Sequence, residues 1–474
     1  MKLKPIGILL SASMLALSIT GCSGGVSPGQ GRQSAGEASA QTAGGKGELA
    51  PPKTIEEQGR GGGETSQGGK KTIVFSTFYE TDFIKDAKAK YEAKHPNIQI
   101  QLTHAQAKGD DANWEANHEK FVKTTNTQML AGKGPDLLEM DQLPIEQYVN
   151  KRALANMSDL MKNDPSFKRE QYFTNILDNV KLSGSVYGMP VRFYLYGLIG
   201  DEDAISKSGV KIDDTSWTWD QFTQTMKALK QKGDREYAFL SRPEYLLSSM
   251  VKTDYAAYVD PIQRKASFDS PRFIGLMTQL KGMYDDEVIS AAVNFPKTYF
   301  IEDMFSSIRN YILSGTTQNP GTFLNRKLYN RPVAEGQQPG GYFRTESTIG
   351  INANSSVQKE AWDFVKFLVS DEVQPGGFPL NKKAYDKLAQ QALKDGAVKA
   401  DEEGQAHGKV FKVTEADMQR LNKLVNEAVH QVEFKPSKVE EIIREESAAF
   451  FKGQKSAEAV AKLVQNRVST YLNE

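Results

Sequence analysis

Residues 72–78 read Thr-Ile-Val-Phe-Ser-Thr-Phe, a run of β-branched and aromatic residues that is typical of a strand. A helical pattern follows at once, with apolar residues on one face from Phe83 to Tyr91, and Pro96 ends it. The alternating run Ile-Gln-Ile-Gln-Leu at 98–102 then predicts a half-buried strand. A strand, a helix and a second strand in this order predict a right-handed βαβ unit in an α/β sheet covered by helices.

The same alternation continues along the chain. Apolar residues from Phe121 to Leu130 predict a second helix that Gly132 ends, and residues 135–140 (Pro-Asp-Leu-Leu-Glu-Met) predict a third strand. The pattern therefore extends the predicted sheet beyond its first two strands.

Two sequence signatures predict helix starts further on. Thr218 with Gln221, and Ser355 with Gln358, each match the capping box, in which two residues satisfy each other's backbone groups at a helix N-terminus. After about residue 414 the pattern is helical throughout.

The first residues match a bacterial lipoprotein signal. Lys2 and Lys4 precede an apolar stretch at 6–19 that is too short to span a bilayer, and residues 19–22 (Ile-Thr-Gly-Cys) end at the single cysteine. The alternative is a buried thiol or half a disulfide, but the chain has no second cysteine. We therefore expect residues 1–21 to be a signal peptide, and Cys22 to carry lipid that anchors the protein at the cell membrane, on the extracytoplasmic face.

Composition divides the rest of the chain. Residues 23–71 contain no aromatic residue and few large aliphatic ones, so we expect the segment 22–71 to be a disordered tether. The part beyond it exceeds what one core supports, about 250–300 residues, and predicts two lobes. Lys plus Arg and Asp plus Glu balance at 59 each, which argues against nucleic acid as a partner and against membrane contact other than through the lipid.

Several motifs of the chain, taken in order, resemble those of family 1 extracellular solute-binding proteins, the substrate-binding lipoproteins of carbohydrate ABC importers. The motifs are Lys90-Tyr-Glu-Ala-Lys-His-Pro-Asn-Ile, Gly134-Pro-Asp-Leu-Leu, Tyr187-Gly-Met-Pro, Thr218-Trp-Asp-Gln-Phe and Asn354-Ser-Ser-Val-Gln-Lys-Glu-Ala-Trp-Asp-Phe-Val-Lys-Phe-Leu. The resemblance covers about residues 72–474.

The resemblance implies a two-lobed α/β fold of the periplasmic-binding-protein type, with discontinuous lobes, a hinge between them and a helical C-terminus. Lobe I would combine 72–188 with 296–335, and lobe II would combine 189–295 with 336–474. The protein would be a monomer that captures a sugar or oligosaccharide between its lobes and delivers it to ABC permease subunits, without cofactor or catalysis. A non-sugar solute remains an alternative, since family members take other small solutes.

Some candidate ligand contacts follow from strand ends, because ligands of open α/β sheets sit beyond the carboxyl ends of strands. Others are Arg-x-Tyr or Tyr-x-Arg pairs that recur near the expected lobe junctions. Aromatic rings suit the apolar faces of sugars, while charged groups suit their hydroxyls and would also suit acidic ligands. The candidates are Phe78, Tyr79, Glu80, Asp82, Asp141, Arg192, Tyr194, Tyr196, Arg309, Tyr311, Tyr342 and Arg344.

Each candidate has a structural alternative. Phe78 could belong to the core, and Asp82 could stabilise the first turn of a helix. Asp141 follows a buried strand, where a lone carboxylate would be costly unless a ligand or partner used it. The arginine and tyrosine candidates occur two residues apart, as on one face of a strand, and could face solvent. Trp114 and Trp217 fall in expected loops and could also be aromatic platforms.

The chain shows no signature of an enzyme. The five histidines lack metal-ligand spacing, and no cysteine nucleophile remains once Cys22 is lipidated. A pair of catalytic carboxylates cannot be chosen from sequence, because their separation in space decides such a mechanism. A secreted, lipid-anchored carbohydrate hydrolase is therefore the alternative from another class.

Overall fold

The structure is a computed structural model that describes residues 69–260, 263–291, 297–314, 323, 325–401, 407–432 and 438–473. The chain divides into two compact units, 1–54 and 55–474, and all described residues belong to the second. The signal peptide, Cys22 and nearly all of the predicted tether lie outside the described residues.

The described strands are β1 (Lys71–Tyr79), β2 (Ile98–Gln106), β3 (Leu137–Glu139), β4 (Gly188–Asp201), β5 (Tyr237–Leu240), β6 (Val259–Asp260), β7 (Lys265–Ala266), β8 (Ile289–Ser290), β9 (Thr298–Phe305), β10 (Arg326–Tyr329), β11 (Gly341–Ile351), β12 (Phe378–Pro379), β13 (Ala397–Lys399), β14 (Val410–Lys412) and β15 (Ala428–Gln431).

The described α-helices are α1 (Asp82–Lys94), α2 (Trp114–Leu130), α3 (Ile145–Asn150), α4 (Met157–Asn163), α5 (Thr174–Asn179), α6 (Glu202–Ser208), α7 (Trp219–Lys232), α8 (Pro243–Thr253), α9 (Pro271–Asp285), α10 (Ile308–Leu313), α11 (Gln358–Leu368), α12 (Lys382–Asp395), α13 (Glu415–Glu427), α14 (Lys438–Phe451) and α15 (Ala457–Asn473).

The predicted βαβ unit is confirmed. Strands β1 and β2 are parallel, with Ile73 opposite Ile100, and α1 connects them. Ile84, Ala87 and Tyr91 form the buried face of α1. Strand β3 pairs with β1 in the same direction, so β1, β2 and β3 bring their carboxyl ends to one edge of the sheet.

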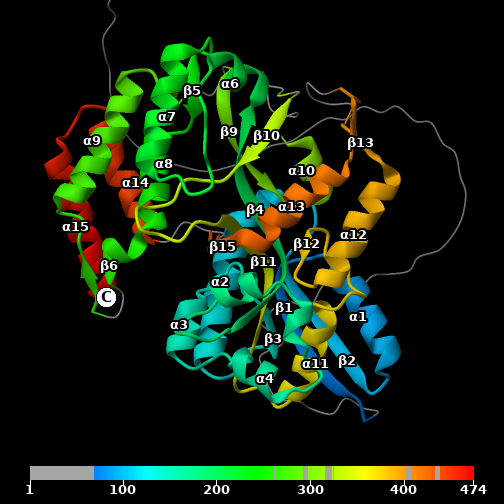
Figure 1. Ribbon diagram of the computed structural model, residues 1–474. Coiled ribbons are helices and arrows are strands. Elements are labelled where there is room, and N and C mark those ends of the chain that lie inside the picture. Colours follow the sequence, from blue (N-terminus) through cyan, green and yellow to red (C-terminus); the bar gives the residue numbers. More distant parts are fainter. Residues whose placement is uncertain are drawn as a thin grey trace, which may run out of the picture. The chain divides into compact units, whose positions relative to one another are not determined.

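One long strand links the two ends of the main sheet. The sheet has the order β2-β1-β3-β11-β4-β9-β5-β8, and β10, β12 and β15 attach to β4 or β11. The first part of β4, residues 188–196, pairs with β11, while residues 195–200 pair with β9 and residues 198–201 with β10. Figure 1 shows β4 running from the strands around β1 and β3 to those around β5 and β9.

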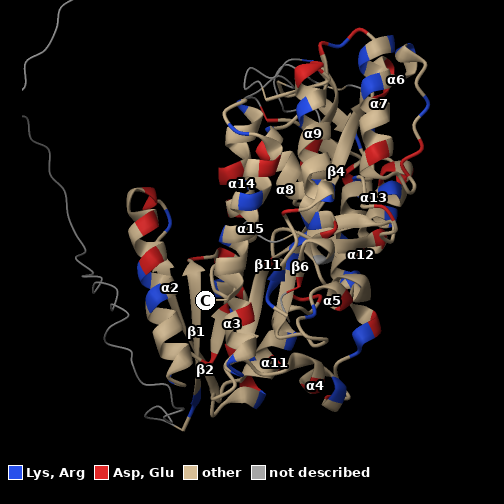
Figure 2. Ribbon diagram, turned by 90° about the vertical axis from the view of Figure 1, so that its left-hand side faces the viewer, with Lys and Arg blue, Asp and Glu red and all other residues tan. Residues whose placement is uncertain are grey.

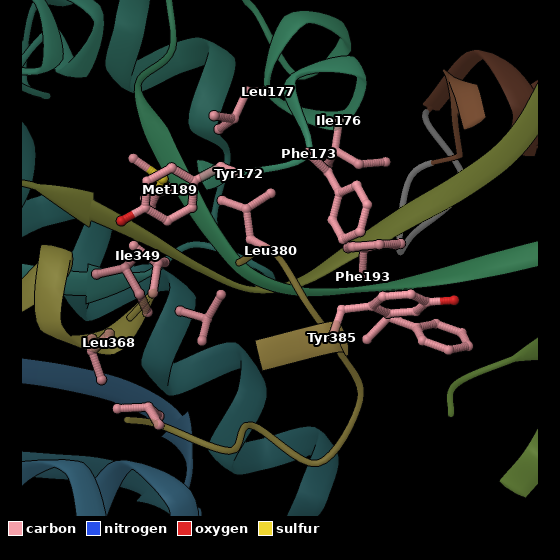
Figure 3. Packing of buried hydrophobic residues seen from close by; sticks show 14 of the residues in the cluster. Tyr172, Phe173, Ile176, Leu177, Met189, Phe193, Ile349, Leu368, Leu380 and Tyr385 are labelled. Atoms are coloured by element: carbon pink, nitrogen blue, oxygen red, sulfur yellow. The ribbon is translucent and has the colours of Figure 1, made fainter. Parts of the chain in front are cut away.

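Two main apolar clusters cover this sheet. One cluster packs β1, β3 and the first part of β4 against α1, α5, α11 and α12; Figure 3 shows Phe173, Phe193 and Tyr385 meeting in it. The other cluster surrounds β5, β9 and α7 to α9 and includes Phe222 and Phe300. Helices α14 and α15 pack in this second cluster through residues such as Val464.

The clusters group the chain differently from the predicted lobes. Residues 341–428, which we assigned to lobe II, contribute buried side chains from Phe343 to Ala428 to the cluster around β1. Tyr329, which we assigned to lobe I, packs in the cluster around β5. The reason is that β11 inserts between β3 and β4 and so brings α11 to α13 to the β1 side.

The predicted helix starts have mixed outcomes. The capping box of Thr218 and Gln221 is present at the start of α7. The one predicted for Ser355 and Gln358 is wrong, because Ser355 Oγ donates to Asp136 and the Gln358 amide donates to backbone carbonyls before α11. The end of the chain is not wholly helical, since β15 pairs with β11.

Charges are mixed over the described surface. Figure 2 shows acidic and basic residues interspersed on helices such as α2 and α14, in keeping with the balanced composition. None of the helices in the described part of the chain has the length and apolar character that crossing a membrane requires.

Candidate ligand-binding site

A cavity of about 520 Å³ opens beside the carboxyl end of β3. It lies between the loop that follows β3, helices α2 and α3, and strands β11 and β15. Amide and hydroxyl side chains alternate in it with apolar ones. The lining residues are His118, Val122, Asn126, Met140, Asp141, Gln142, Leu143, Pro144, Ile145, Gln147, Thr345, Thr348, Gln431 and Val432.

An aromatic cluster adjoins the cavity. The Trp114 Nε1 donates to Tyr79 Oη at 2.7 Å, and the Trp114 ring stacks on His118 with 5.0 Å between centroids. His118 itself lines the cavity. Phe78 is buried beneath these rings and contacts Tyr79, Trp114 and Phe121 edge-on or tilted. Phe78 is therefore a core residue here, whereas the Tyr79 side chain is exposed.

The placement of Trp114 differs from the expected loop. Trp114 is the first residue of α2, and its ring is partly buried. The other candidate platform, Trp217, is buried in the second apolar cluster, where its Nε1 donates to the Asn330 carbonyl at 2.9 Å. Trp217 is therefore a packing residue, and only Trp114 lies next to the cavity.

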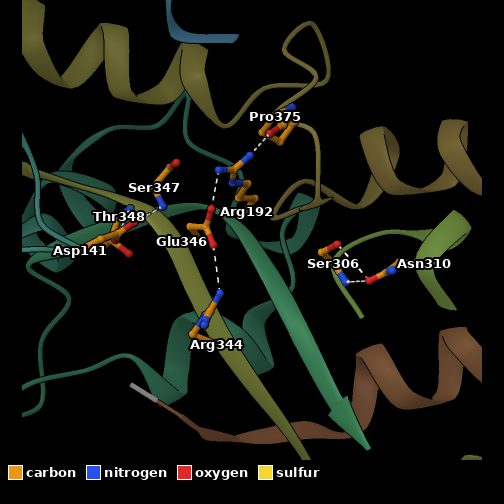
Figure 4. Close-up of polar contacts among 9 residues, drawn as sticks. All are labelled: Asp141, Arg192, Ser306, Asn310, Arg344, Glu346, Ser347, Thr348 and Pro375. Atoms are coloured by element: carbon orange, nitrogen blue, oxygen red, sulfur yellow. Dashed lines mark hydrogen bonds and ion pairs between the residues drawn. The ribbon is translucent and has the colours of Figure 1, made fainter. Parts of the chain in front are cut away.

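The Asp141 carboxylate is not the lone buried charge that the sequence suggested. Its Oδ2 accepts the Ser347 N–H at 2.6 Å and its Oδ1 accepts the Thr348 N–H at 3.0 Å, both from β11 (Figure 4). Burial raises the pKa of Asp141 to about 6, although these backbone hydrogen bonds oppose the shift. Asp141 thus lines the cavity and also holds a neighbouring strand.

A second carboxyl group lies two residues earlier. Glu139 is buried at the end of β3, and its pKa is raised to about 8, first by burial and then by the charge of Asp141. Sequence reasoning missed Glu139, because it lies inside a short run that was assigned as a buried apolar strand. The two-residue spacing of Glu139 and Asp141 was the available signal.

The arginine and tyrosine candidates of β4 lie opposite those of β11. In the antiparallel register, Arg192 faces Glu346, Tyr194 faces Arg344, and Tyr196 faces Tyr342. Glu346 was not among the predicted contacts. It lies two residues after Arg344, just as Arg344 lies two residues after Tyr342.

Glu346 joins the two arginines. Arg192 donates to Glu346 Oε1 at 2.6 Å and to the Pro375 carbonyl at 2.5 Å, and Arg344 donates to Glu346 Oε2 at 3.2 Å (Figure 4). The Arg344 guanidinium also lies over the Tyr194 ring, 5.1 Å from its centroid. The two guanidinium groups therefore share one carboxylate inside the protein.

Tyr342 and Tyr196 are less accessible than an aromatic ring that contacts a sugar would be. Tyr342 is buried, its hydroxyl donates to the Pro332 carbonyl at 3.1 Å, and the Arg331 guanidinium lies 4.6 Å from its ring centroid. Burial raises the pKa of Tyr196, which the guanidinium of Arg344 opposes.

Arg309 and Tyr311 do not join the other candidates. They lie on helix α10, where residues two apart point to different sides, so the strand interpretation of this pair is wrong. Arg309 donates to the Lys399 carbonyl and to Asp401, each at 2.8 Å, and Tyr311 is buried in the first apolar cluster.

The two acidic candidates after β1 have ordinary ion-pair partners. Glu80 forms an ion pair with Lys85, which lowers the pKa of Glu80. Asp82 is the first residue of α1, is exposed, and lies 3.6 Å from Lys108. This position fits the alternative role of Asp82 at the start of a helix. Ligand contact by either residue stays a prediction.

Gln142 has an unsatisfied acceptor at the cavity. The residue is 7% exposed, and its buried Oε1 has no hydrogen-bond partner among the described residues. A buried amide oxygen without a donor is unfavourable for the stability of the fold. Gln142 is one of the residues that directly follow the third predicted strand, where strand ends predict ligand contacts.

The described residues contain no group of three or more His, Cys, Asp or Glu side chains arranged to hold a metal ion. The cavity walls carry hydrogen-bonding and apolar side chains, and the Trp114 ring stacks on the lining residue His118.

Residues 78–375 match the family described as bacterial extracellular solute-binding protein, and the chain belongs to that family. It is a substrate-binding protein of the family 1 type with a two-lobed periplasmic-binding-protein fold.

Solved structures share this fold at low sequence identity. A family 1 extracellular solute-binding protein from Alicyclobacillus acidocaldarius subsp. acidocaldarius DSM 446 has a TM-score of 0.57 at 15% identity, covering 86% of this chain and 100% of its own. The sugar-binding protein MalE from Xanthomonas citri has a TM-score of 0.59 at 17% identity, covering 85% and 97%. A periplasmic oligogalacturonide-binding protein from Yersinia enterocolitica has a TM-score of 0.58 at 16% identity, covering 85% and 99%.

Proposed function

We propose that this protein captures a sugar or oligosaccharide at the cavity beside β3 and delivers it to the permease of an ABC importer. The proposal rests on the stacked rings of Trp114 and His118, beside a cavity lined by amide and hydroxyl side chains. Sugars present apolar C–H faces and a rim of hydroxyl groups, so they need ring surfaces together with neutral hydrogen-bonding groups.

The relatives support this ligand class. The Xanthomonas citri protein is described as sugar-binding and the Yersinia enterocolitica protein as binding oligogalacturonide. Their likeness to this chain is one of fold, so the choice of a saccharide rests on the cavity itself.

In the proposed function, lipid anchors the protein at the membrane, and the protein does not change its ligand chemically. Lipid on Cys22 would hold the protein at the membrane while the segment 22–71 gives it reach toward the permease. Binding and release of the unchanged ligand would be the whole reaction, and a non-sugar solute or a hydrolysed oligosaccharide would be the competing outcomes.

A titration of the full chain with gluco-, galacto-, manno- and xylo-oligosaccharides tests the proposal. We expect saturable binding of at least one saccharide by calorimetry, a change in tryptophan fluorescence, and full recovery of the ligand by chromatography. Absence of binding across the panel would contradict the proposal, and release of shorter products would favour the hydrolase.

Variants of Trp114 locate the site. Trp114→Ala should weaken binding by about tenfold, since a lost ring contact is worth about 1 kcal/mol or somewhat more, whereas Trp114→Phe should retain most of the affinity. Tyr245→Ala, which removes an exposed ring from α8 outside the cavity, is the matched control and should bind like the wild type. Equal affinity of Trp114→Ala and the control would place the site elsewhere.

A further inference from the structure

A second cavity, of about 190 Å³, is separate from the one beside β3. Residues of helices α10 and α13 and of strands β4, β10 and β14 line it, and the two cavities share no lining residue (Figure 1). Pockets for drug-sized ligands usually measure about 300–1,000 Å³, so this volume suits a small ion better than an oligosaccharide.

Positive charge is in excess on the wall of this second cavity. Its charged lining residues are three cations and one carboxylate, namely Arg326, Lys412, Arg420 and Asp417. The carboxylate is committed within its own helix. Asp417 Oδ1 accepts from Arg420 at 2.9 Å, and Oδ2 accepts the Thr414 N–H at 3.0 Å and the Thr414 hydroxyl at 2.6 Å, as part of the capping box that begins α13. Two of the three positive charges are therefore left without a matching carboxylate in the lining.

Arg326 is the least exposed of these cations. It is half-buried, and its guanidinium donates to the Ile312 carbonyl at the end of α10 and lies 5.4 Å from the centroid of the Phe411 ring. Both partners are neutral. Burial lowers the pKa of Arg326; the charge of Asp417 opposes this shift, and that of Arg420 adds to it. The two guanidinium groups are thus close enough to repel each other, and a bound anion would offset that repulsion.

The chain that borders the cavity adds hydrogen-bond donors and no further carboxylate. Ser314 and Asn325 both line the cavity, and residues 315–324 between them include no aspartate or glutamate. Tyr311 also lines it, and the charge of Arg420 opposes the rise that burial causes in the pKa of Tyr311. A tyrosine hydroxyl is a donor to an anion. The sequence had marked Tyr311 as a ligand contact, and here it lies beside a different cavity from the one proposed for the saccharide.

We propose that this second cavity binds a small tetrahedral oxyanion, such as inorganic phosphate, through the guanidinium groups of Arg326 and Arg420. Guanidinium donors form a planar fork that matches the oxygens of phosphate, and such charge-assisted hydrogen bonds are stronger than neutral ones. Lys412, which is exposed, adds positive charge at the edge of the cavity. This site goes beyond the proposed function, because capture of a saccharide does not require it.

The first test titrates the full chain with inorganic phosphate by calorimetry and uses sodium chloride of equal ionic strength as the control. Two charge-assisted hydrogen bonds predict saturable binding at one site, with a dissociation constant of about 1 mM or lower. Phosphate should also raise the melting temperature more than chloride does, because it binds the folded state. Absence of saturable binding, or an equal effect of chloride, would overturn the proposal. No saccharide is present, so the result is independent of the proposed function.

Glycerol phosphate distinguishes the free ion from a phosphate group on a larger molecule. We expect it to bind more weakly than inorganic phosphate, because the cavity is small. Tighter binding of glycerol phosphate would overturn the choice of a free ion.

A variant of Arg420 locates the site. Arg420→Gln should weaken phosphate binding by about tenfold or more, the effect of losing one charge-assisted hydrogen bond. The Arg420 side chain is about half exposed, so its replacement leaves the core intact.

Lys423→Gln is the matched control, since it removes one positive charge from an exposed residue of the same helix that does not line the cavity. It should change the affinity for phosphate less than twofold. A loss of affinity in Arg420→Gln alone would support the site. Unchanged affinity in Arg420→Gln, or an equal loss in both variants, would contradict it.

Discussion

The Asp141 carboxylate holds Ser347 in a left-handed backbone conformation. Its Oδ2 accepts the Ser347 N–H at 2.6 Å, and Ser347 has a φ of 54° within a strand that is otherwise paired with β4 from Tyr342 to Gly350. Ser347 lacks a partner in that register, so the carboxylate takes the place of the missing ladder contact. Strain of this kind persists only where its surroundings enforce it, and here the enforcing group also lines the cavity beside β3.

Removal of the Asp141 carboxylate should therefore destabilise the fold. Asp141→Ala leaves two backbone N–H groups without acceptors, so we expect a loss of about 2–4 kcal/mol in the free energy of unfolding, measured in urea. Asp82→Ala, which removes an exposed carboxylate, should change it by less than about 0.5 kcal/mol. A wild-type unfolding curve for Asp141→Ala would show that Asp141 does not support β11.

Glycine should fit position 347 better than serine. Because glycine adopts positive φ without a steric penalty, Ser347→Gly should raise the free energy of unfolding by up to about 1 kcal/mol. Thr348→Gly is the matched control. It should lower the free energy of unfolding by about 1 kcal/mol, because Thr348 lies next to Ser347 in β11 but has no positive φ. Equal destabilisation by both substitutions would argue against strain at Ser347.

Glu139 should make stability fall as pH rises. Its pKa is about 8 in the folded protein and near 4.5 when unfolded, so the folded state binds more protons between these values. Stability contributed by the neutral acid is then present at pH 4.5 and lost toward pH 8. Glu139→Gln should reduce this loss in the free energy of unfolding by roughly 3–5 kcal/mol between pH 4.5 and pH 8. Denaturation at several pH values measures it.

The control for this change is Glu372→Gln, which alters an exposed carboxylate in an ion pair with Lys94. Its pH dependence should parallel that of the wild type. If Glu139→Gln also parallels the wild type, Glu139 is ionised in the folded protein at neutral pH.

The sequence predicted individual strands and helices better than it predicted which of them pack together in one lobe. The strand at 72–78, the helix that Pro96 ends and the capping box at Thr218 depend on neighbouring residues, and each is present. The insertion of β11 between β3 and β4 depends on pairing across 146 residues or more, and no local pattern encodes it. The predicted lobe boundaries consequently differ from the apolar clusters.

In the candidate site, too, the features that depend on local sequence were predicted better than those that depend on distant partners. Residue type and strand ends led to Tyr79 and Asp141, which lie at or beside the cavity. The spacing of Arg309 and Tyr311 looked like a strand but belongs to a helix. Glu346 was missed because its importance depends on Arg192, a partner that lies far away in the sequence.

The lipid anchor is a prediction from the first residues of the chain. Cys22→Ser should prevent lipid attachment and release the protein from the membrane fraction into the soluble one, as followed by fractionation and immunoblotting. Ser23→Ala, the neighbouring substitution, should leave the protein with the membrane. Retention of Cys22→Ser in the membrane fraction would show that another part of the protein holds it there.

The most direct measurement is a calorimetric titration of the full chain with neutral oligosaccharides, followed by chromatography of the ligand. The account predicts saturable binding of a saccharide that is recovered intact, with about tenfold weaker binding in Trp114→Ala. Failure of every saccharide to bind, or recovery of shorter products, would contradict it.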